Sequence, residues 1–385
     1  MNNSPAQGQD PLGRISSAGV SVWLDDLSRS ALTDGSLAGL IRDRHVVGVT
    51  TNPTIFAGAV SAGDAYDAQL ATLASSGADT EAAVLALTTD DVRNACDLFT
   101  DVHAATGGRD GRVSIEVDPR LAHQTEETVQ AASLLWQTVD RPNLMVKIPA
   151  TPEGLPAITE AIAAGLSVNV TLIFSLDRYR AVAQAYIDGL ERAQRAGIDL
   201  STIRSVASIF LSRIDAKVDA ALEEIGTQEA SSLRGRAAIA GARLAYGVYE
   251  EIIASPRFAD LAAAGAHPQR LLWASTGTKD PDYPDTMYVD ELVTADVVST
   301  MPRDTLEAVA DHSGATGADR VRGTQAEAQA VLDHLQRLGV DYEGILADLE
   351  TDGVTKFENS WTELLQRVSE GLTEAAATGT GQGQR

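Results

Sequence analysis

Short runs rich in aliphatic and β-branched residues alternate with longer alanine-rich runs along this chain. The short runs have the length and composition of buried strands, and the longer runs have those of helices. Strands and helices in regular alternation are typical of βα units built around a parallel sheet. The expected strands are Ser21–Asp25, Val46–Thr51, Arg112–Val117, Leu144–Ile148, Ser167–Phe174, Arg204–Phe210, Arg270–Ser275 and Ala295–Thr300.

Eight such strands with helices between them predict an α/β fold, a single closed (β/α)8 barrel of the TIM type with extra helices, rather than an open doubly wound sheet. In the expected helix over residues 121–139, Thr128, Ala132 and Trp136 share one apolar stripe that can cover the sheet. Residues 176–196 are also helical by composition, and residues 215–264 are long enough for two or more helices.

The length of 385 residues fits one barrel with insertions, so we expect a single catalytic domain over residues 15–374. The first twenty residues are polar and Gly/Ser-rich, and residues 375–385 are Gly/Thr/Gln-rich without apolar anchors. We therefore expect both ends, residues 1–14 and 375–385, to be flexible tails.

The charge of the chain limits its partners. It carries 54 acidic and 30 basic side chains, a net charge of −24. An acidic chain without a basic stripe repels nucleic acid, although it can still bind small phosphorylated molecules. The first residues contain no apolar signal segment, and no apolar run is long enough to span a membrane, so we expect a soluble cytoplasmic protein with no membrane partner.

Cysteine and histidine usage narrows the chemistry. The one cysteine, Cys96, excludes an intramolecular disulfide, and we expect it to be a buried thiol. The six histidines are scattered without ligand spacing, so no metal site is predicted and a metal-dependent aldolase is disfavoured. Neither a GxGxxG motif nor a Walker loop occurs, which disfavours a nucleotide cofactor.

One strand contains a lysine among aliphatic residues. In Leu144–Ile148, side chains alternate faces, and Lys147 shares a face with Met145. If Lys147 points into a barrel, burial disfavours its ammonium form and favours the neutral amine that attacks a carbonyl. The alternative is a lysine at a strand end whose ammonium group reaches solvent.

Polar residues also occur at the carboxyl ends of other expected strands: Asp25, Asn52, Glu116, Asn169 and Thr171. Each has a structural alternative, as a helix cap, a satisfied core or turn group, or a salt-bridge partner. Together with Lys147 they lie where (β/α)8 enzymes place their chemistry. We therefore interpret them as one site.

Five segments carry a family resemblance: Gly48–Thr54, Ser114–Leu121, Leu144–Thr151, Asn169–Ser175 and Ser208–Arg213. Together they resemble the transaldolase family, class I aldolase-type barrels of the pentose phosphate pathway. The resemblance implies transfer of a dihydroxyacetone unit from sedoheptulose 7-phosphate or fructose 6-phosphate to an aldose phosphate, erythrose 4-phosphate or glyceraldehyde 3-phosphate. It implies a lysine Schiff base and no cofactor.

The same resemblance assigns catalytic roles. Lys147 matches the Schiff-base lysine, and Asp25 matches the acid/base carboxylate that handles the proton of the hydroxyl next to the cleaved bond. Glu116 and Thr171 match the pair that holds a catalytic water.

It also assigns substrate contacts. Asn52 and Asn169 match amides that bond the sugar hydroxyls, Ser208 matches a hydroxyl near the C1 end of the substrate, and Phe210 lies in the same segment. At the phosphate end, the matching residues are Arg213 and Ser275. Many family members have a second arginine two residues beyond that serine, where this chain has Thr276-Gly277-Thr278-Lys279. We expect Lys279 to replace it, the alternative being a solvated loop lysine.

Two rival functions remain open on the sequence. A fructose-6-phosphate aldolase-like enzyme would release free dihydroxyacetone, but that branch is shorter and typically has glutamine and tyrosine where this chain has Glu116 and Phe210. A non-catalytic sugar-phosphate-binding barrel would have no need of an amine buried beside carboxylates, whose desolvation is costly. Sugar phosphates are the expected ligands in every case, and the oligomeric state is not predicted.

Overall fold

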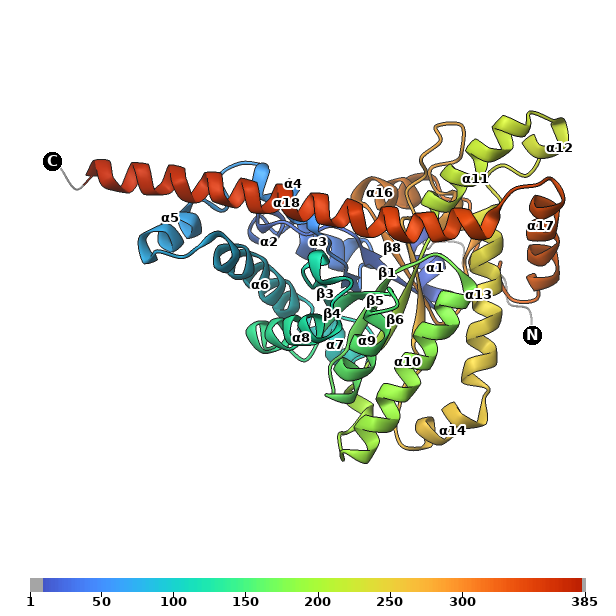
Figure 1. Ribbon diagram of the computed structural model, residues 1–385, viewed down its shortest axis with the longest axis horizontal. Helices are drawn as coiled ribbons and strands as arrows, with labels where there is room; N and C mark the ends of the chain where they lie inside the picture. The colour runs from blue at the N-terminus through green and yellow to red at the C-terminus, as the bar shows by residue number, and fades with distance from the viewer. Residues whose placement is uncertain (1–9, 383–385) are drawn as a thin grey trace.

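The computed structural model describes residues 10–382, with side chains described as far as residue 377. Its centre is a closed barrel of eight parallel strands, in which each strand pairs with the next along the chain and the last pairs with the first (Figure 1). The prediction of a (β/α)8 barrel is confirmed. The strands are β1 (Val20–Leu24), β2 (Gly48–Val49), β3 (Arg112–Glu116), β4 (Leu144–Pro149), β5 (Val168–Ile173), β6 (Ser205–Phe210), β7 (Arg270–Ala274) and β8 (Val297–Met301).

Helices surround the barrel, and the last helix of the chain crosses one of its ends (Figure 1). The expected helix over residues 176–196 is α10, and the stretch over residues 215–264 holds parts of several helices. The α-helices are α1 (Pro11–Ser17), α2 (Arg29–Thr33), α3 (Ser36–Asp43), α4 (Pro53–Ser61), α5 (Asp67–Ser76), α6 (Thr80–Leu98), α7 (Thr100–Ala105), α8 (Thr125–Val139), α9 (Gly154–Ala163), α10 (Leu176–Arg195), α11 (Ser212–Ile225), α12 (Gln228–Ser231), α13 (Ala237–Ile253), α14 (Pro256–Ala263), α15 (Met287–Glu291), α16 (Arg303–His312), α17 (Gln325–Arg337) and α18 (Tyr342–Gln382). Two 3-10 helices are η1 (Pro119–Leu121) and η2 (Leu200–Thr202).

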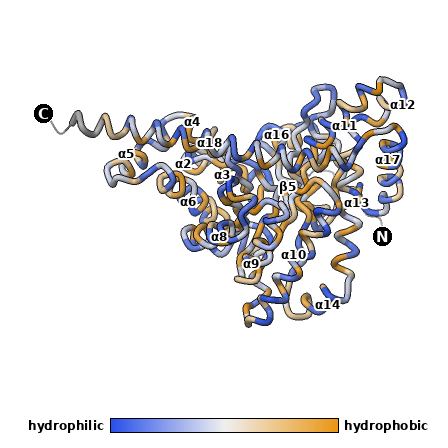
Figure 2. The backbone as a smooth tube through the Cα atoms, in the orientation of Figure 1, coloured by the Kyte–Doolittle hydropathy of each residue, from blue (hydrophilic) through white to orange (hydrophobic). Residues whose placement is uncertain are grey.

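Burial explains why the short runs form the barrel. Every residue of the eight strands is buried, since side chains fill the interior and helices cover the outside. Figure 2 shows hydrophobic segments gathered at the centre, around β5. Cys96 is buried in α6, which confirms the expected thiol, and this burial raises its pKa to about 12.

Strand β2 is much shorter than the predicted run over residues 46–51. The backbone N–H groups of Val47 and Thr50 still donate to the oxygens of Val22 and Leu24, both at 2.8 Å, so the chain stays beside β1. Asn52 then caps α4, which begins at Pro53 and ends the extended segment.

The expected N-terminal tail differs from the structure at residues 11–14, which belong to α1. Asp10 caps this helix by accepting from Gly13 N at 2.9 Å, and Pro11 occupies its first turn. Leu12 and Ile15 are fully buried, so this short segment is anchored by apolar side chains. Residues 1–9 of the expected tail lie outside the described part of the chain.

The expected C-terminal tail also differs, because α18 continues through residue 382. The run of alanines at residues 375–377 favours this continuation. α18 crosses the barrel on the side where the strands end, and its far part lies along α4 and α5 (Figure 1). A Cβ on Gly353 would lie 3.0 Å from Leu172 Cδ2, so the absence of a side chain there lets α18 pack closely on β5.

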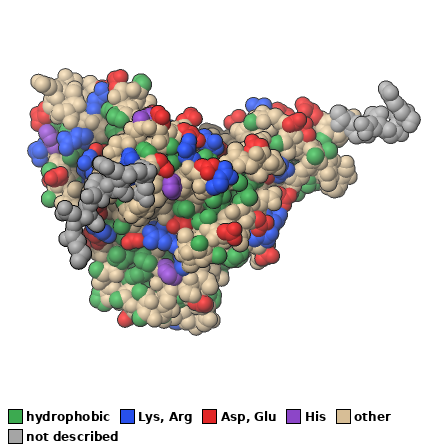
Figure 3. Space-filling model, turned by 180° about the vertical axis from the view of Figure 1, so that it is seen from behind, with side chains coloured by type: hydrophobic (Ala, Val, Ile, Leu, Met, Phe, Trp, Pro, Cys, Tyr) green, Lys and Arg blue, Asp and Glu red, His purple; other side chains and the backbone are tan. Residues whose placement is uncertain are grey.

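The surface carries charges of both signs. On the face that Figure 3 shows, acidic and basic side chains are interspersed, and neither sign forms an extended stripe across that face. No helix within the described residues is both long and apolar enough to cross a membrane.

Candidate active site

A cavity of about 280 Å³ opens where the barrel strands end. In a parallel barrel these carboxyl ends meet on one face, and the loops that follow them hold functional side chains. All but two of the site residues singled out in the sequence line this cavity: Asp25, Asn52, Lys147, Thr171, Ser208, Phe210, Arg213, Ser275 and Lys279. The other two, Glu116 and Asn169, contact lining residues from below.

Lys147 and Glu116 face each other inside the barrel, on paired positions of β4 and β3. Lys147 Nζ lies 3.3 Å from Glu116 Oε2 and donates a hydrogen bond to Thr51 O at 3.0 Å. The lysine side chain is 6% exposed, so it does not extend to solvent. Burial raises the pKa of Glu116 to about 7, although the charge of Lys147 lowers it. A buried amine beside a carboxyl group that exchanges its proton near neutrality can form an imine with a carbonyl.

Asp25 follows β1 at the rim of the same cavity. Its carboxylate accepts a hydrogen bond from Thr50 Oγ1 at 2.6 Å, and Thr50 Oγ1 lies 2.7 Å from Thr300 Oγ1. The nearest helix, α2, is capped by Ser28, so Asp25 is not a helix cap. The two threonines hold the carboxylate in one orientation.

Strand β5 is irregular at Thr171. Its pairing with β6 shifts between Val170 and Ile173, and Leu172 adopts a left-handed backbone conformation with φ of 59°. Thr171 Oγ1 is buried and has no hydrogen-bond partner among the described residues. Irregular strands at barrel rims redirect side chains, and here a hydroxyl that lines the cavity is left available to a ligand.

Hydrogen bonds fix the amides and the serine. Asn169 Nδ2 donates to Ser114 Oγ at 3.0 Å, and Ser208 Oγ donates to Asn169 Oδ1 at 2.7 Å. Asn169 therefore orients Ser208 from below the cavity. Asn52 Oδ1 accepts from Ile55 N at 3.1 Å as the cap of α4, so its structural role accompanies its place in the cavity wall.

Arg213 and Ser275 line the cavity from neighbouring segments, which are joined by a hydrogen bond from Ser212 N to Ser275 O at 3.1 Å. The Arg213 guanidinium lies over the rings of Phe210 and Phe357, 5.1 and 5.8 Å from their centroids. Burial lowers the pKa of Arg213, although the nearby carboxylates oppose this. Ser275 Oγ lies 2.8 Å from Ser212 Oγ, and Ser275 has a left-handed φ of 55°. Strained backbone of this kind is concentrated at functional sites.

Lysine usage contains a signal that the sequence analysis missed. The chain has only four lysines, against 26 arginines, and three of the four line this cavity: Lys147, Lys279 and Lys356. Lys356 lies on α18, and the charge of Arg213, followed by burial and Lys279, lowers its pKa. No strand pattern could have pointed to Lys356, because it belongs to a helix near the end of the chain. Its neighbour Phe357 also lines the cavity, with its ring 5.6 Å from Lys147 Nζ.

A second cavity of about 450 Å³ adjoins the first between α4, α6, α8 and α18. It shares Asn52 and Glu116 with the site but is walled mainly by aliphatic side chains such as Leu85 and Leu135. The described residues of its lining include no lysine or arginine. The smaller cavity is therefore the one suited to an anionic, carbonyl-bearing substrate.

Known proteins with similar sequences belong to the family that the sequence resembles. The profile of the family described as "Transaldolase/Fructose-6-phosphate aldolase" matches residues 22–368. A transaldolase of Mycolicibacterium smegmatis is 58% identical over 369 residues, which are 96% of this chain and 99% of that protein. A transaldolase of Thermobifida fusca is 59% identical over 362 residues, 94% of this chain and 98% of that protein. Transaldolase 1 of Streptomyces avermitilis is 57% identical over 368 residues, 96% of this chain and 97% of that protein.

Proposed function

Because this chain belongs to the transaldolase/fructose-6-phosphate aldolase family, we propose that it transfers a dihydroxyacetone unit between sugar phosphates through a Schiff base on Lys147. The donors are sedoheptulose 7-phosphate or fructose 6-phosphate, and the acceptors are erythrose 4-phosphate or glyceraldehyde 3-phosphate. The observation that carries this proposal is the buried contact of 3.3 Å between Lys147 Nζ and Glu116 Oε2, where Lys147 lines a cavity that further cations also line.

The first half of the reaction makes the imine. The neutral Lys147 amine attacks the C2 carbonyl of the ketose, and the carbinolamine loses its hydroxyl as water. Both steps move protons, and Glu116, with a pKa of about 7, is suited to give and take them. The free hydroxyl of Thr171 is suited to hold the water that carries these protons.

The second half breaks and remakes a carbon–carbon bond. Asp25 removes the proton of the C4 hydroxyl, the C3–C4 bond breaks, and its electron pair moves into the iminium to leave an enamine on Lys147. The shortened aldose phosphate leaves. The enamine then attacks the aldehyde carbon of the acceptor, Asp25 returns the proton, and water hydrolyses the new imine.

The remaining residues that line the cavity position the substrate. The Ser208 hydroxyl and the Asn52 amide are placed for the hydroxyl groups of the sugar, and Asn169 positions Ser208. Arg213, Ser275 and Lys279 are placed for the phosphate, because charge-assisted hydrogen bonds are the strong contacts to such groups. Such phosphates are charged and stay on one side of a membrane, so we assign the protein to the cytoplasm.

The rival aldolase activity differs only in the fate of the enamine, which would be protonated and released as dihydroxyacetone. Glu116, rather than glutamine, supports the transferase. Incubation with fructose 6-phosphate and erythrose 4-phosphate should give sedoheptulose 7-phosphate and glyceraldehyde 3-phosphate. Without an acceptor, free dihydroxyacetone should not accumulate, and its steady release would favour the aldolase.

The Schiff base itself can be located by mass spectrometry. Borohydride treatment with fructose 6-phosphate should fix a three-carbon or six-carbon adduct on the peptide that contains Lys147. Only three other lysines compete, Lys217, Lys279 and Lys356, so the assignment is unambiguous. An adduct on any of these three, or none on Lys147, would overturn the proposed mechanism.

A further inference from the structure

A separate cavity of about 380 Å³ lies at the opposite end of the barrel, where the strands begin. It shares no lining residue with the active-site cavity. Four arginines line it: Arg109, Arg112, Arg204 and Arg270. Arg112 and Arg270 are the first residues of β3 and β7, and Arg204 immediately precedes β6. In a chain with a net charge of −24, this is a local concentration of positive charge.

Within the described part of the chain, carboxylates form close ion pairs with only two of these arginines. Arg270 pairs with Asp110 and Arg109 pairs with Asp296, both at 3.0 Å. Arg112 and Arg204 form no ion pair with any described residue. Arg112 Nε donates to Gly108 O at 2.9 Å, and Arg204 Nη2 donates to Gly107 O at 3.0 Å. These hydrogen bonds to neutral carbonyls occupy some of the donors and leave both guanidinium groups without a carboxylate in direct contact.

Burial and the charges of these arginines together lower the pKa of Arg112 and the pKa values of two neighbouring histidines. Burial, followed by the charges of Arg204 and Arg270, lowers the pKa of Arg112 to about 9. Burial and the charges of Arg112 and Arg204 also lower the pKa of His103 and of His267. His103 Nε2 is buried and has no hydrogen-bond partner in the described part of the chain.

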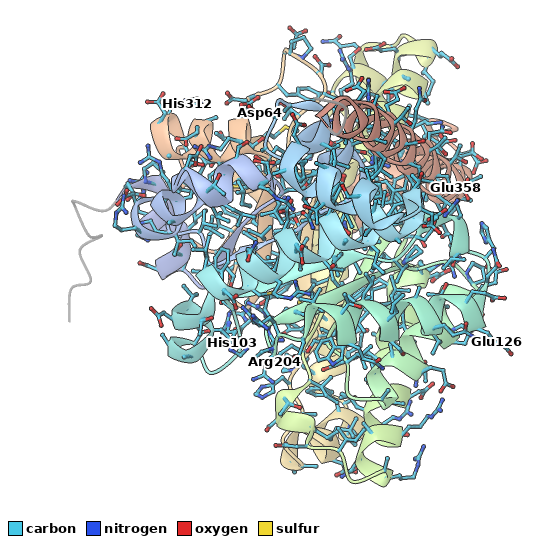
Figure 4. The ribbon with its side chains drawn as sticks, turned by 90° about the vertical axis from the view of Figure 1, so that its left-hand side faces the viewer. Asp64, His103, Glu126, Arg204, His312 and Glu358 are labelled. Carbon is cyan, nitrogen blue, oxygen red and sulfur yellow. The ribbon has the colours of Figure 1, made fainter. Side chains whose placement is uncertain are left out.

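His103 belongs to the same group of side chains. A Cβ on Gly108 would lie 3.2 Å from His103 Nε2 and 3.3 Å from Arg112 Nη2, so both groups flank this glycine. Figure 4 shows His103 and Arg204 close together in its lower half, with Glu358 of α18 in the upper half. The cluster therefore lies on the far side of the barrel from the helix that crosses the active site.

We infer that this cavity binds a small anion bearing a phosphate group, at a site distinct from the active site. Planar guanidinium groups match phosphate oxygens in pairs, and an anion here would supply the charge that Arg112 and Arg204 lack. Met145, Val206, Ile253 and Pro268 form an apolar part of the same wall. This wall suits the organic part of a phosphorylated metabolite and favours such a ligand over inorganic phosphate.

A purely structural role for these arginines is the alternative to a ligand site. Arginines that bond backbone carbonyls can hold the loops before β3 and β6, and Arg112 does so. That role does not require an open volume of about 380 Å³ between the arginines, whereas a ligand accounts for it.

Histidine resonances can report binding at this site alone. No histidine is among the described residues that line the active-site cavity, whereas His267 lines the arginine cavity and His103 adjoins it. The full chain, labelled with ¹³C at histidine Cε1, is titrated with pyrophosphate, and the signals are assigned with His103→Gln and His267→Gln variants. Saturable shifts confined to His103 and His267 are expected. The absence of saturable shifts at millimolar pyrophosphate would overturn the site.

Variants then test the arginines. Arg204→Gln and Arg109→Gln should each weaken the pyrophosphate affinity about 10- to 100-fold, the effect of losing one charge-assisted contact. Arg180→Gln removes an exposed arginine that pairs with Glu251 and should leave the affinity unchanged. Thermal unfolding confirms that each variant is folded. If both cavity variants are folded and bind like the wild type, the inference fails.

The source of the phosphate is tested by parallel titrations with inorganic phosphate, fructose 6-phosphate and a nucleoside monophosphate. Tighter binding of an organic phosphate would identify the apolar wall as part of the site. Equal affinity for inorganic phosphate would assign recognition to the arginines alone. Among the described residues, no histidine lines the active-site cavity, so fructose 6-phosphate bound there should leave these signals unchanged, and failure of this test leaves the proposed function intact.

Discussion

Glu116 Oε2 lies 3.3 Å from Lys147 Nζ, and the two side chains are only 4% and 6% exposed. The pair lies on adjacent strands in register, so the backbone itself fixes the contact. Because burial raises the pKa of Glu116 to about 7, this carboxyl group can change protonation state within the physiological range.

The raised pKa predicts a dependence of stability on pH. In the unfolded chain Glu116 ionises near its ordinary value of 4.5, and in the folded protein near 7. Between these values the folded state binds the extra proton, so the contribution of this group to stability is lost as pH rises toward 7. The Glu116→Gln variant has no carboxyl group at this position, so its stability does not change with pH through this group. Its free energy of unfolding, relative to wild type, should therefore increase by about 1–3 kcal/mol from pH 5 to pH 8.

Urea unfolding at intervals across that range measures the difference. Glu126→Gln, at an exposed position of α8, provides the control and should show no comparable trend (Figure 4). A Glu116→Gln difference that is flat or falls with pH would contradict the raised pKa.

Asp25 should act after the imine has formed. Asp25→Asn should slow carbon–carbon bond cleavage about 10²–10⁴-fold, the usual contribution of a positioned acid or base, and leave imine formation largely intact. Rapid-quench borohydride trapping with fructose 6-phosphate follows the imine, and release of glyceraldehyde 3-phosphate follows cleavage. Loss of trapping in Asp25→Asn would move this residue to the first half of the reaction. Asp26→Asn is the matched control beside it.

The barrel and most of the site could be predicted because they lie on strands. A charged residue such as Lys147 is conspicuous in an aliphatic strand, and the order of the strands places Asp25 and Glu116 at the same end of the barrel. Lys356 gave no such signal, since a lysine on an amphipathic helix looks the same whether it faces solvent or a cavity. The irregular backbone at Leu172 was equally hidden, because tertiary packing imposes it on an ordinary leucine.

The close approach of α18 to β5 can be tested at Gly353. Gly353→Val should lower the free energy of unfolding by about 1–3 kcal/mol, because its side chain would overlap Leu172, whose Cδ2 would lie 3.0 Å from the new Cβ. It should also raise KM for fructose 6-phosphate, since Lys356 and Phe357 follow three and four residues later in α18. Gly58→Val in α4, where a Cβ meets nothing within 4 Å, controls for helix propensity. Equal destabilisation by the two variants would show that the contact with Leu172 carries no cost.

The four lysines give the sharpest test of how an acidic protein holds a dianionic substrate. Lys279 and Lys356 both line the cavity near Arg213, whereas Lys217 pairs with Asp352 at 2.8 Å on the outer surface. Lys279→Ala and Lys356→Ala should each lower kcat/KM for fructose 6-phosphate about 10- to 100-fold, since each removes one charge-assisted contact to phosphate. With unphosphorylated dihydroxyacetone as donor, both variants should match wild type, and Lys217→Ala should match it with either donor. If only Lys356→Ala lowers kcat/KM for fructose 6-phosphate, the second phosphate cation comes from α18. The loop after β7, nearly eighty residues earlier in the chain, then does not supply it.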